Sequence, residues 1–335
     1  MEMPQADLNK NMLVTGATGF VGHNLVEALL QKGYSVTCLV RKTSDTRALQ
    51  RQHVRLVVGD LNDPQAVRQA ARGVFAACHL AGVIKAANRE DYYRINQGGT
   101  RILLEALAEA NPGLNRFIHV SSLAAAGPSN SDRGLTEDEQ PNPVSWYGES
   151  KLRSEQEVLR YSDAFPATIL RPSAVYGPHD SETLLIFRMI KRGYLLTPGR
   201  FTRRFSLIHV EDLVAACIKA AESNTPSGEI YFISRPEIHT WGDVGRVIAQ
   251  KLGKSYRQIS FPQWMAVTVG LAGDLWAGVT GRPATLNSQK VRELLQPSWI
   301  CNTSKAREAL GFSPAIDLES GINETVRWYQ NQGWL

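Results

Sequence analysis

The sequence predicts an α/β protein: a doubly wound parallel sheet with a smaller, mainly helical lobe toward the C-terminus. Two patterns lead to this fold class. Short, continuously apolar runs alternate with helical patterns through the first half of the chain, and from about residue 236 the pattern is mainly helical. Continuously apolar strands indicate a sheet covered on both faces, and their alternation with helices indicates right-handed βαβ units.

The expected strands of the first half are NMLVTG (11–16), SVTCLVR (35–41), VRLVVGD (54–60), AACHLAG (76–82) and RFIHVSS (116–122). Helical stretches between them are HNLVEALLQKG, which closes with Gly33, and DPQAVRQAARG, which opens with Asp63 and Pro64. Proline near a helix start and glycine at its end are typical boundary signals. Further strands are expected within 166–178 and 205–210, and VEDLVAACIKAAE is the expected helix after the second.

A glycine-rich loop, TGATGFVG, joins the first expected strand to the first helix. Its Gly16, Gly19 and Gly22 would allow a tight turn and a close approach of the backbone to a pyrophosphate at the helix N-terminus. A strand before the loop and a helix after it distinguish this pattern from a chance glycine repeat. The loop therefore predicts a Rossmann-type dinucleotide site. We expect a dinucleotide-binding domain at 1–177, rejoined by 205–235, and a substrate lobe formed by 178–204 and 236–335.

The residues after the second and third strands bear on which dinucleotide is bound. NAD-binding chains usually place an acidic residue about 20 positions beyond the loop, whereas this chain has Arg41 followed by Lys42 at the end of the second strand. An arginine there suits a 2′-phosphate, so NADP(H) is the preferred cofactor and NAD(H) the alternative. Arg41 could instead stack on adenine without selecting either one. Asp60 is a candidate for the adenine amino group, and Asp63 for helix capping.

Composition argues against several other classes of protein. The formal net charge is +5, and RFTRRF (200–205) is the one local basic cluster, which would hold a phosphate or simply be solvated, so no nucleic-acid partner is expected. The four cysteines are widely spaced, which predicts buried thiols in a reducing compartment and no metal site. The N-terminus has no signal-peptide pattern, and WMAVTVGLAGDLWAGVT (264–280) is interrupted by Asp274. We expect a cytoplasmic protein without a membrane span, although 261–281 could contact a membrane or an apolar substrate.

The pentapeptide YGESK places Tyr147 and Lys151 four residues apart where a helix resumes. By itself the spacing fits a catalytic pair or a half-buried aromatic beside a solvated lysine. Together with TGATGFVG, GDLND, HLAG, the serine pair at 121–122, LRPSAVYGP and LIHVEDL in this order, the chain resembles the extended short-chain dehydrogenase/reductases. Within that superfamily it is nearer the 3β-hydroxysteroid dehydrogenase and dihydroflavonol-reductase branch. The resemblance covers nearly the whole chain.

The resemblance implies a catalytic set of Ser122, Tyr147 and Lys151. Tyr147 would be the acid/base, Lys151 would lower its pKa and hold the nicotinamide ribose, and Ser122, with Ser121 as the alternative, would bind the reacting oxygen. Residues four apart share a helix face, so a nearby ammonium should lower the phenol pKa from its usual value of about 10. The expected cofactor contacts are Gly16, Thr18, Gly19, Phe20, Val21, Gly22, Arg41, Asp60, Leu61, Leu80, Ala81, Gly82, Tyr147, Lys151, Pro172 and Val175.

Departures from the family's patterns narrow the chemistry. In the sugar-nucleotide 4,6-dehydratases of this superfamily a Thr-Asp-Glu-type run follows the serine, because elimination of water needs an extra acid and base. This chain has Leu123, Ala124 and Ala125 there. Epimerase-like relatives hold a nucleotide diphosphate with an arginine where this chain has Phe205, one position after Arg204. The lobe that carries Trp264, Met265 and Trp276 more resembles the 3β-hydroxysteroid dehydrogenase and dihydroflavonol-reductase branch. The two tryptophans are expected to lie in the core and not in the wall of the substrate pocket.

We therefore predict an NAD(P)-dependent oxidoreductase acting on a small-molecule ketone or secondary alcohol. The alternatives are a nucleotide-sugar 4-epimerase using bound NAD and a non-catalytic NAD(P)-sensing protein. The family also implies a homodimer through helices near 89–110 and 147–162. The pocket itself is expected to be shaped by loops around 85–95, 124–145 and 178–204.

Overall fold

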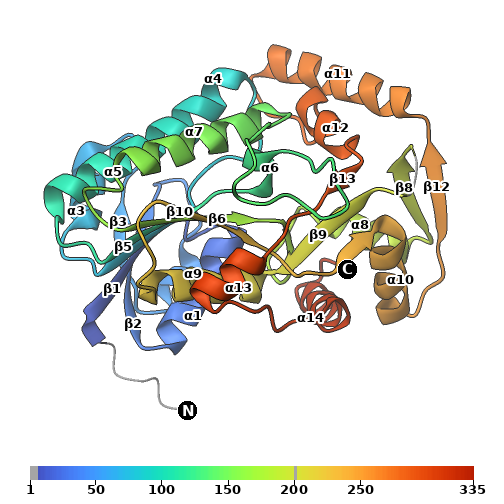
Figure 1. Ribbon diagram of the computed structural model, residues 1–335. Helices are drawn as coiled ribbons and strands as arrows, with labels where there is room; N and C mark the ends of the chain where they lie inside the picture. Colours follow the sequence, from blue (N-terminus) through green and yellow to red (C-terminus); the bar gives the residue numbers. More distant parts are fainter. Residues whose placement is uncertain (1–6, 200–201) are drawn as a thin grey trace.

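The protein is described from a computed structural model, which covers residues 7–199 and 202–335. This described part contains a seven-stranded, all-parallel sheet in the order β10-β6-β5-β4-β1-β2-β3 (Figure 1). Its strands are β1 (Asp7–Thr15), β2 (Tyr34–Val40), β3 (Arg55–Val58), β4 (Ala76–His79), β5 (Arg116–Val120), β6 (Ala167–Pro172) and β10 (Glu229–Ile233). The chain reverses its direction of winding between β1 and β4, which is where open α/β sheets bind ligands.

Helices cover both faces of this sheet (Figure 1). One face carries α3 (Pro64–Ala71), α5 (Gly99–Ala110) and α7 (Trp146–Arg160), and the other carries α1 (Phe20–Gln31), α9 (Val210–Glu222) and α13 (Ser304–Leu310). Neighbouring residues of a strand point to opposite faces, so Val14 packs in the core beneath α1 and α9 while Leu13 packs in the core beneath α3 and α5. Both side chains are fully buried. This two-faced burial explains the continuously apolar strands, and the predicted fold class is confirmed.

The strand expected within 166–178 is two strands in different sheets. After β6, the short β7 (Ala174–Tyr176) leaves the large sheet and pairs with β9 (Arg204–His209). A second sheet adds β11 (Ile238–Thr240) and β13 (Ser298–Trp299) to that pair, and β8 (Tyr194–Pro198) pairs in parallel with β12 (Arg257–Phe261). The last three strands after residue 236 escaped the sequence pattern because β11 and β13 are very short and β12 is largely exposed.

The remaining helices are α2 (Arg47–Gln50), α4 (Arg89–Tyr92), the π-helix η1 (Tyr93–Gly98), α6 (Leu123–Ala126), α8 (Leu184–Lys191), α10 (Trp241–Leu252), α11 (Gln263–Thr280), α12 (Ser288–Leu294) and α14 (Leu318–Asn331). Helices α8, α10 and α14 pack with β8 and β9 around a third core. Helices α11 and α12 lie beyond the N-terminal end of α7 (Figure 1).

All four cysteines are buried free thiols, as the sequence predicted. Burial raises the pKa of Cys38 and of Cys301 to about 12, so these thiols are protonated and act as small apolar side chains. Within residues 7–199 and 202–335, none of the helices has the length and hydropathy needed to cross a bilayer.

Candidate active site

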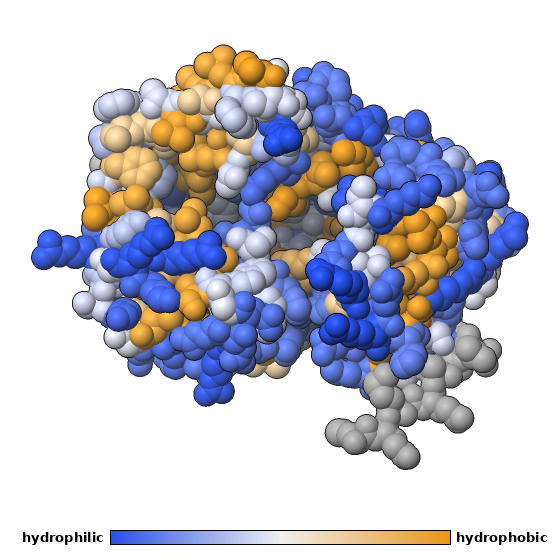
Figure 2. All heavy atoms as spheres, turned by 180° about the vertical axis from the view of Figure 1, so that it is seen from behind, coloured by the Kyte–Doolittle hydropathy of each residue, from blue (hydrophilic) through white to orange (hydrophobic). Residues whose placement is uncertain are grey.

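The fold gathers the predicted cofactor residues at one edge of the large sheet. The glycine loop follows β1, Arg41 follows β2, Asp60 and Leu61 follow β3, and the segment from Leu80 to Gly82 follows β4. Pro172 is the last residue of β6, and Val175 lies in β7. Because the carboxyl ends of parallel strands share one edge, the residues that follow β1 to β4 and the end of β6 lie along the edge where open α/β sheets bind ligands. Seen from behind, the molecule is hollowed near its centre (Figure 2).

The loop between β1 and α1 is closed too tightly to accept side chains. A Cβ at Gly16, whose φ is +75°, would lie 2.8 Å from the amide nitrogen of Ala81, and one at Gly22 would lie 2.1 Å from the carbonyl oxygen of Gly16. Gly19 is the N-cap of α1 and has no side chain to cap the helix. The unpaired backbone amides of the first turn and the positive end of the helix dipole are therefore open to an anion. This backbone cradle fits the pyrophosphate of a dinucleotide.

Three polar residues beyond the glycine loop, Arg41, Asp60 and Asp63, have different hydrogen-bond partners and exposure. Arg41 is exposed immediately after β2, beside the point where the Gly59 amide donates a hydrogen bond to the Val40 carbonyl oxygen. The Asp60 carboxylate accepts from the amide and the side-chain nitrogen of Asn62, whereas Asp63 caps α3. The expected capping role of Asp63 is therefore confirmed, and Arg41 remains exposed at the edge that would receive an adenosine ribose.

Asn96 is a site residue that the sequence analysis missed. It is buried in the π-helix η1, where it accepts from the Val83 amide at 2.7 Å and donates to the Val83 carbonyl oxygen at 3.0 Å and the Ser150 hydroxyl at 2.8 Å. Ser150 in turn donates to the Tyr147 carbonyl oxygen. Asn96 thus ties the segment after β4 to the helix of Tyr147. A π-turn is often found at functional sites, but a single sequence gives no signal for it.

Ser122 and Tyr147 are brought together by a close contact between α6 and α7. Ser122 caps α6 by accepting from the Ala124 amide, and its hydroxyl lies beside the Tyr147 phenol, whose pKa it lowers. A Cβ at Gly148 would lie 2.3 Å from the Ala124 carbonyl oxygen, so the glycine of YGESK is what lets the two helices touch. The Ser121 hydroxyl instead donates to buried Glu155, so Ser122 is the serine that faces the tyrosine.

The pKa of Tyr147 departs from the sequence prediction. Burial raises it to about 12, and the neighbouring Ser122 hydroxyl only partly offsets this effect. The expectation of a lowered pKa is therefore wrong, because desolvation outweighs any benefit of the helix face that Tyr147 shares with Lys151. At neutral pH the phenol therefore keeps its proton, and it is able to donate it.

Lys151 is almost fully buried beneath the same edge of the sheet. Its Nζ donates to the Val120 carbonyl oxygen at 2.8 Å, which brings α7 to the carboxyl end of β5. Burial lowers the pKa of Lys151 to about 8, and nearby Glu155 partly restores it. The ammonium is thus still the main form at neutral pH. Burial, and to a smaller extent the charge of Lys151, lowers the pKa of His79 to about 3, so this histidine is neutral.

A fully buried ion pair anchors α7 to β6. Arg171 donates from Nε and Nη2 to the two carboxylate oxygens of Glu155, at 2.9 and 2.7 Å. Both side chains are at most 2% exposed. Each charge satisfies the other in a bidentate geometry, so the pair fixes the helix that carries Tyr147 against the sheet.

The basic cluster RFTRRF does not form a free anion site among its described residues. Arg204 is ion-paired with Asp132, and Arg203 donates to the Pro198 carbonyl oxygen. Arg200 and Phe201 lie outside the described residues. Phe205 is buried against Trp241, with ring centroids 4.7 Å apart, so an apolar side chain occupies the position of the arginine expected in an epimerase.

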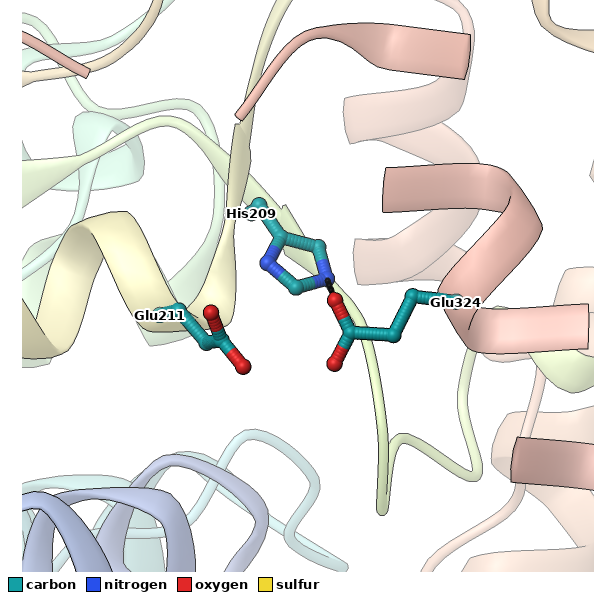
Figure 3. A group of neighbouring side chains, drawn as sticks. All are labelled: His209, Glu211 and Glu324. Atoms are coloured by element: carbon teal, nitrogen blue, oxygen red, sulfur yellow. Dashed lines mark ion pairs between the residues drawn. The ribbon is translucent and has the colours of Figure 1, made fainter. Parts of the chain in front are cut away.

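A separate cluster joins β9, α9 and α14. Figure 3 shows the imidazole of His209 between the carboxylates of Glu211 and Glu324, whose ligand atoms all lie within 4.8 Å of one another. Burial lowers the pKa of His209 to about 4, and burial with the nearby Glu211 raises that of Glu324 to about 7. Ligands of a tetrahedral zinc ion lie about 3.4 Å apart at bond lengths of ~2.0–2.1 Å. The cluster is therefore looser than a formed zinc site.

The profile of the NAD dependent epimerase/dehydratase family matches residues 12–234. The chain belongs to this family. It is 37% identical over 324 residues to a ceramide reductase of Caulobacter vibrioides, covering 96% of this chain and 95% of that protein. It is 27% identical over 342 residues to the human sterol-4-alpha-carboxylate 3-dehydrogenase, decarboxylating, covering 96% and 89%.

A solved structure shows the same fold at lower sequence identity. The UDP-glucuronic acid 4-epimerase from Bacillus cereus, in complex with UDP-glucuronic acid and NAD, superposes with a TM-score of 0.78 at 23% identity. The comparison covers 96% of this chain and 99% of that one. The protein is thus an enzyme of the extended short-chain dehydrogenase/reductase type, in a family of NAD-dependent enzymes. Its relatives are consistent both with a reductase/dehydrogenase and with a nucleotide-sugar epimerase.

Proposed function

We propose that the protein is a reductase/dehydrogenase that prefers NADP(H) and interconverts a ketone and a secondary alcohol on an apolar, lipid-like substrate. The observation that carries this proposal is the placement of Ser122 beside the protonated Tyr147 at the ligand-binding edge of the sheet. The residues after Ser122 are Leu123 and alanines, so elimination of water has no second acid or base in this run.

Ketone reduction requires a hydride on carbon, which a reduced nicotinamide supplies when bound, and a proton on oxygen. Ser122 donates a hydrogen bond to the carbonyl oxygen, and Tyr147 passes its proton to that oxygen as negative charge develops there. Lys151 keeps positive charge beneath this edge of the sheet and favours the phenolate left behind. The residues proposed to hold the dinucleotide are those of the glycine cradle, Arg41, Asp60 and the segment from Leu80 to Gly82, with Pro172 and Val175 toward the nicotinamide.

Arg41 supports the preference for NADP(H). It stands exposed where NAD-binding relatives usually carry an acidic residue, and a guanidinium is well matched to the geometry of a phosphate. An NAD-selecting carboxylate at this place would repel a 2′-phosphate. NAD(H) remains the second cofactor to be tried.

Two observations favour a lipid ketone over a nucleotide sugar. The relative of highest identity given above is named for ceramide, and the human relative is named for a sterol carboxylate. Phe205 and the ion-paired Arg204 replace the free arginine expected of a site that holds a nucleotide diphosphate. The keto form of a ceramide is therefore the first substrate to test.

The two-lobe division, the cytoplasmic location and the homodimer stay predictions. The division proposed is 1–177 with 205–235 for the dinucleotide and 178–204 with 236–335 for the substrate. Strand β10 supports it by joining the large sheet, although β9 belongs to the small sheet with β7. The helices proposed for the dimer interface correspond to α4, η1, α5 and α7.

The test is a substrate screen with purified protein. The absorbance of NADPH is followed with a keto-ceramide, with a smaller water-soluble ketone and with UDP-sugars. We expect NADPH to be oxidised by the ketones in proportion to the alcohol formed. Interconversion of UDP-sugars without net change in the dinucleotide would establish the epimerase instead.

A further inference from the structure

Helix α11 packs against the protein through its small residues. Ala266, Gly270 and Ala277 are buried, and they recur at the spacing of one helix face. A Cβ at Gly270 would lie 2.9 Å from the Val291 side chain of α12, and one at Gly273 would lie 2.1 Å from the Leu286 carbonyl oxygen. The backbone of α11 thus lies directly on the protein, and its large side chains have no place on this face.

The large apolar side chains of α11 point into solvent. Trp264 is 66% exposed, Trp276 60% and Val279 87%, so the expectation that the tryptophans belong to the core is wrong. The large apolar side chains of the helix that are at least two-fifths exposed are Trp264, Met265, Val267, Val269, Leu271, Leu275, Trp276 and Val279. A helix at a protein surface normally turns such residues inward. Figure 2 shows hydrophobic side chains gathered over this end of the molecule.

The exposed apolar surface continues beyond the helix. Leu196 of β8 and Ile259 of β12 are each more than two-fifths exposed, and α11 contacts β8. We call these two residues and the eight exposed side chains of α11 the apolar ridge. Contiguous apolar patches of this kind mark sites of interaction with another molecule or a membrane.

The charged residues nearest in sequence to the apolar ridge of α11 are mostly positive. Between residues 254 and 287 the basic residues are Lys254, Arg257 and Arg282, all exposed, and the acidic residue is Asp274. Asp274 is only partly exposed and accepts from the Ser288 amide, on the side where α11 meets the segment leading into α12. Basic groups beside exposed tryptophans are the composition that favours the surface of a membrane with anionic lipids.

The apolar ridge is one helix away from the proposed acid. Helix α11 rests on α12, and α12 holds the start of α7: Gln289 accepts from the Trp146 amide at 3.1 Å, and Glu293 accepts from the Ser145 hydroxyl at 2.6 Å. Tyr147 is the next residue of α7. The apolar ridge and the proposed acid are thus connected through the single helix α12.

We propose that α11 docks on a lipid bilayer, with the apolar ridge among the headgroups and upper acyl chains, and that this brings a membrane-borne substrate to Tyr147. The delivery step rests on the proposed function, whereas the docking does not. A bilayer suits a convex row of large side chains because its chains deform around them. The two tryptophans are residues typical of the membrane interface.

The docking is tested with vesicles of phosphatidylcholine and phosphatidylglycerol, in a flotation assay that requires no turnover. We expect the wild type to float with the vesicles and the Trp276→Glu/Val279→Glu variant to lose at least tenfold in partition coefficient. Arg282→Glu should weaken binding to the phosphatidylglycerol vesicles more than to phosphatidylcholine alone. Leu185→Glu, which changes an exposed leucine on α8, is the matched control and should float like the wild type.

Several results would overturn the docking proposal. One is a wild type that does not float, and another is a Trp276→Glu/Val279→Glu variant that floats equally well. A third is a variant that floats unchanged but turns a dimer into a monomer in sedimentation, because the ridge would then be a contact between two copies.

Turnover of the water-soluble ketone separates this proposal from the proposed function. The Trp276→Glu/Val279→Glu variant should keep that rate and lose turnover of keto-ceramide presented in vesicles. Flotation without turnover of either ketone by the wild type would leave docking established and the proposed function refuted.

Discussion

Helices α7 and α11 both depart from the usual relation between polarity and burial. Helix α7 buries polar side chains, whereas α11 exposes apolar ones. Along α7 the buried side chains include Ser150, Lys151, Ser154, Glu155 and Glu157. Along α11 most of the exposed side chains are large and apolar. Globular proteins normally bury large apolar side chains and expose charged and polar ones.

The two helices differ in where their partners lie. Each buried polar group of α7 discussed above meets a partner within the chain: Lys151 the Val120 carbonyl, Glu155 the Arg171 guanidinium, and Ser150 the Tyr147 carbonyl. The apolar side chains of α11 face outward. Polarity buried with its partners indicates a built site, whereas apolar surface left exposed indicates a partner outside the chain.

The largest expected effect comes from removing the phenol of α7. Tyr147→Phe should lower kcat by about 10²–10⁴-fold, the range typical of a lost general acid, because the proton donor disappears. Dinucleotide binding, measured by fluorescence titration, should change by less than about threefold, or ~0.7 kcal/mol, because the phenol is not required to hold the pyrophosphate. Tyr161→Phe near the other end of α7 is the control. A Tyr147→Phe variant with full activity would rule out this phenol as the acid.

The buried ion pair of α7 comes next. Arg171→Met should leave the Glu155 carboxylate buried without its cation and lower the free energy of unfolding by about 3–5 kcal/mol. Denaturant unfolding measures this loss. Arg246→Met, which breaks an exposed pair with Asp243, should stay within about 1 kcal/mol of the wild type. Similar losses in both variants would show that burial does not distinguish the two pairs.

The third prediction concerns Arg41, an exposed polar side chain. Its proposed partner is the dinucleotide, so it lies outside the chain, as does the proposed partner of α11. Arg41→Ala should weaken NADPH binding by about tenfold, or ~1.4 kcal/mol, and should change NADH binding far less. Arg51→Ala, an exposed arginine after α2, is the matched control. Equal losses for both dinucleotides would assign Arg41 to adenine stacking and remove the argument for NADP(H).

The smallest expected effect concerns Glu324, which is half-buried beside Glu211. Its folded pKa is raised to about 7 from an ordinary 4.5, so the folded state holds this proton more tightly than the unfolded state. Stability from Glu324 is therefore present at low pH and is lost as the pH rises from about 4.5 through 7. His209 opposes this slope, because its pKa is lowered to about 4 and its charging destabilises the fold at low pH.

Comparing the wild type with Glu324→Gln isolates the part of the pH dependence of stability that comes from Glu324. Melting temperatures at pH 5 and pH 7.5 should show the wild type losing on the order of 1 °C more than the variant, since solvent screens a half-exposed group. Glu319→Gln, on the same helix, should behave like the wild type. Parallel profiles for all three proteins would mean that Glu324 titrates at its ordinary pKa.

The large sheet was predictable because its signals are local. Apolar runs such as that around Val14 and Leu13 are buried on both faces, and Gly16 and Gly22 occupy positions that a Cβ would obstruct. The positions of Ser122 and Tyr147 at a common edge then follow from the order of strands and helices. Strands, helices and tight turns are thus predictable from the sequence where a segment and its neighbours along the chain decide the structure.

The rest depends on packing between distant segments. The bonds of Asn96 to Val83 and Ser150 form only when a π-turn meets α7. The spacing of Tyr147 and Lys151 predicts a shared face but does not reveal the desolvation that raises the phenol pKa. Likewise, the hydropathy of residues 264–280 does not show that Gly270 and Gly273 occupy the packed face and force Trp276 outward.

The most direct test of the account is a label-transfer measurement with NADPH carrying deuterium at the transferable position. The wild type is incubated with a keto-ceramide, and the product is analysed by mass spectrometry. The account predicts one deuterium on the new carbinol carbon for each NADPH oxidised, with the product almost absent for Tyr147→Phe. Unlabelled alcohol, or no alcohol from any ketone while UDP-sugars interconvert without net oxidation of NADPH, would contradict it.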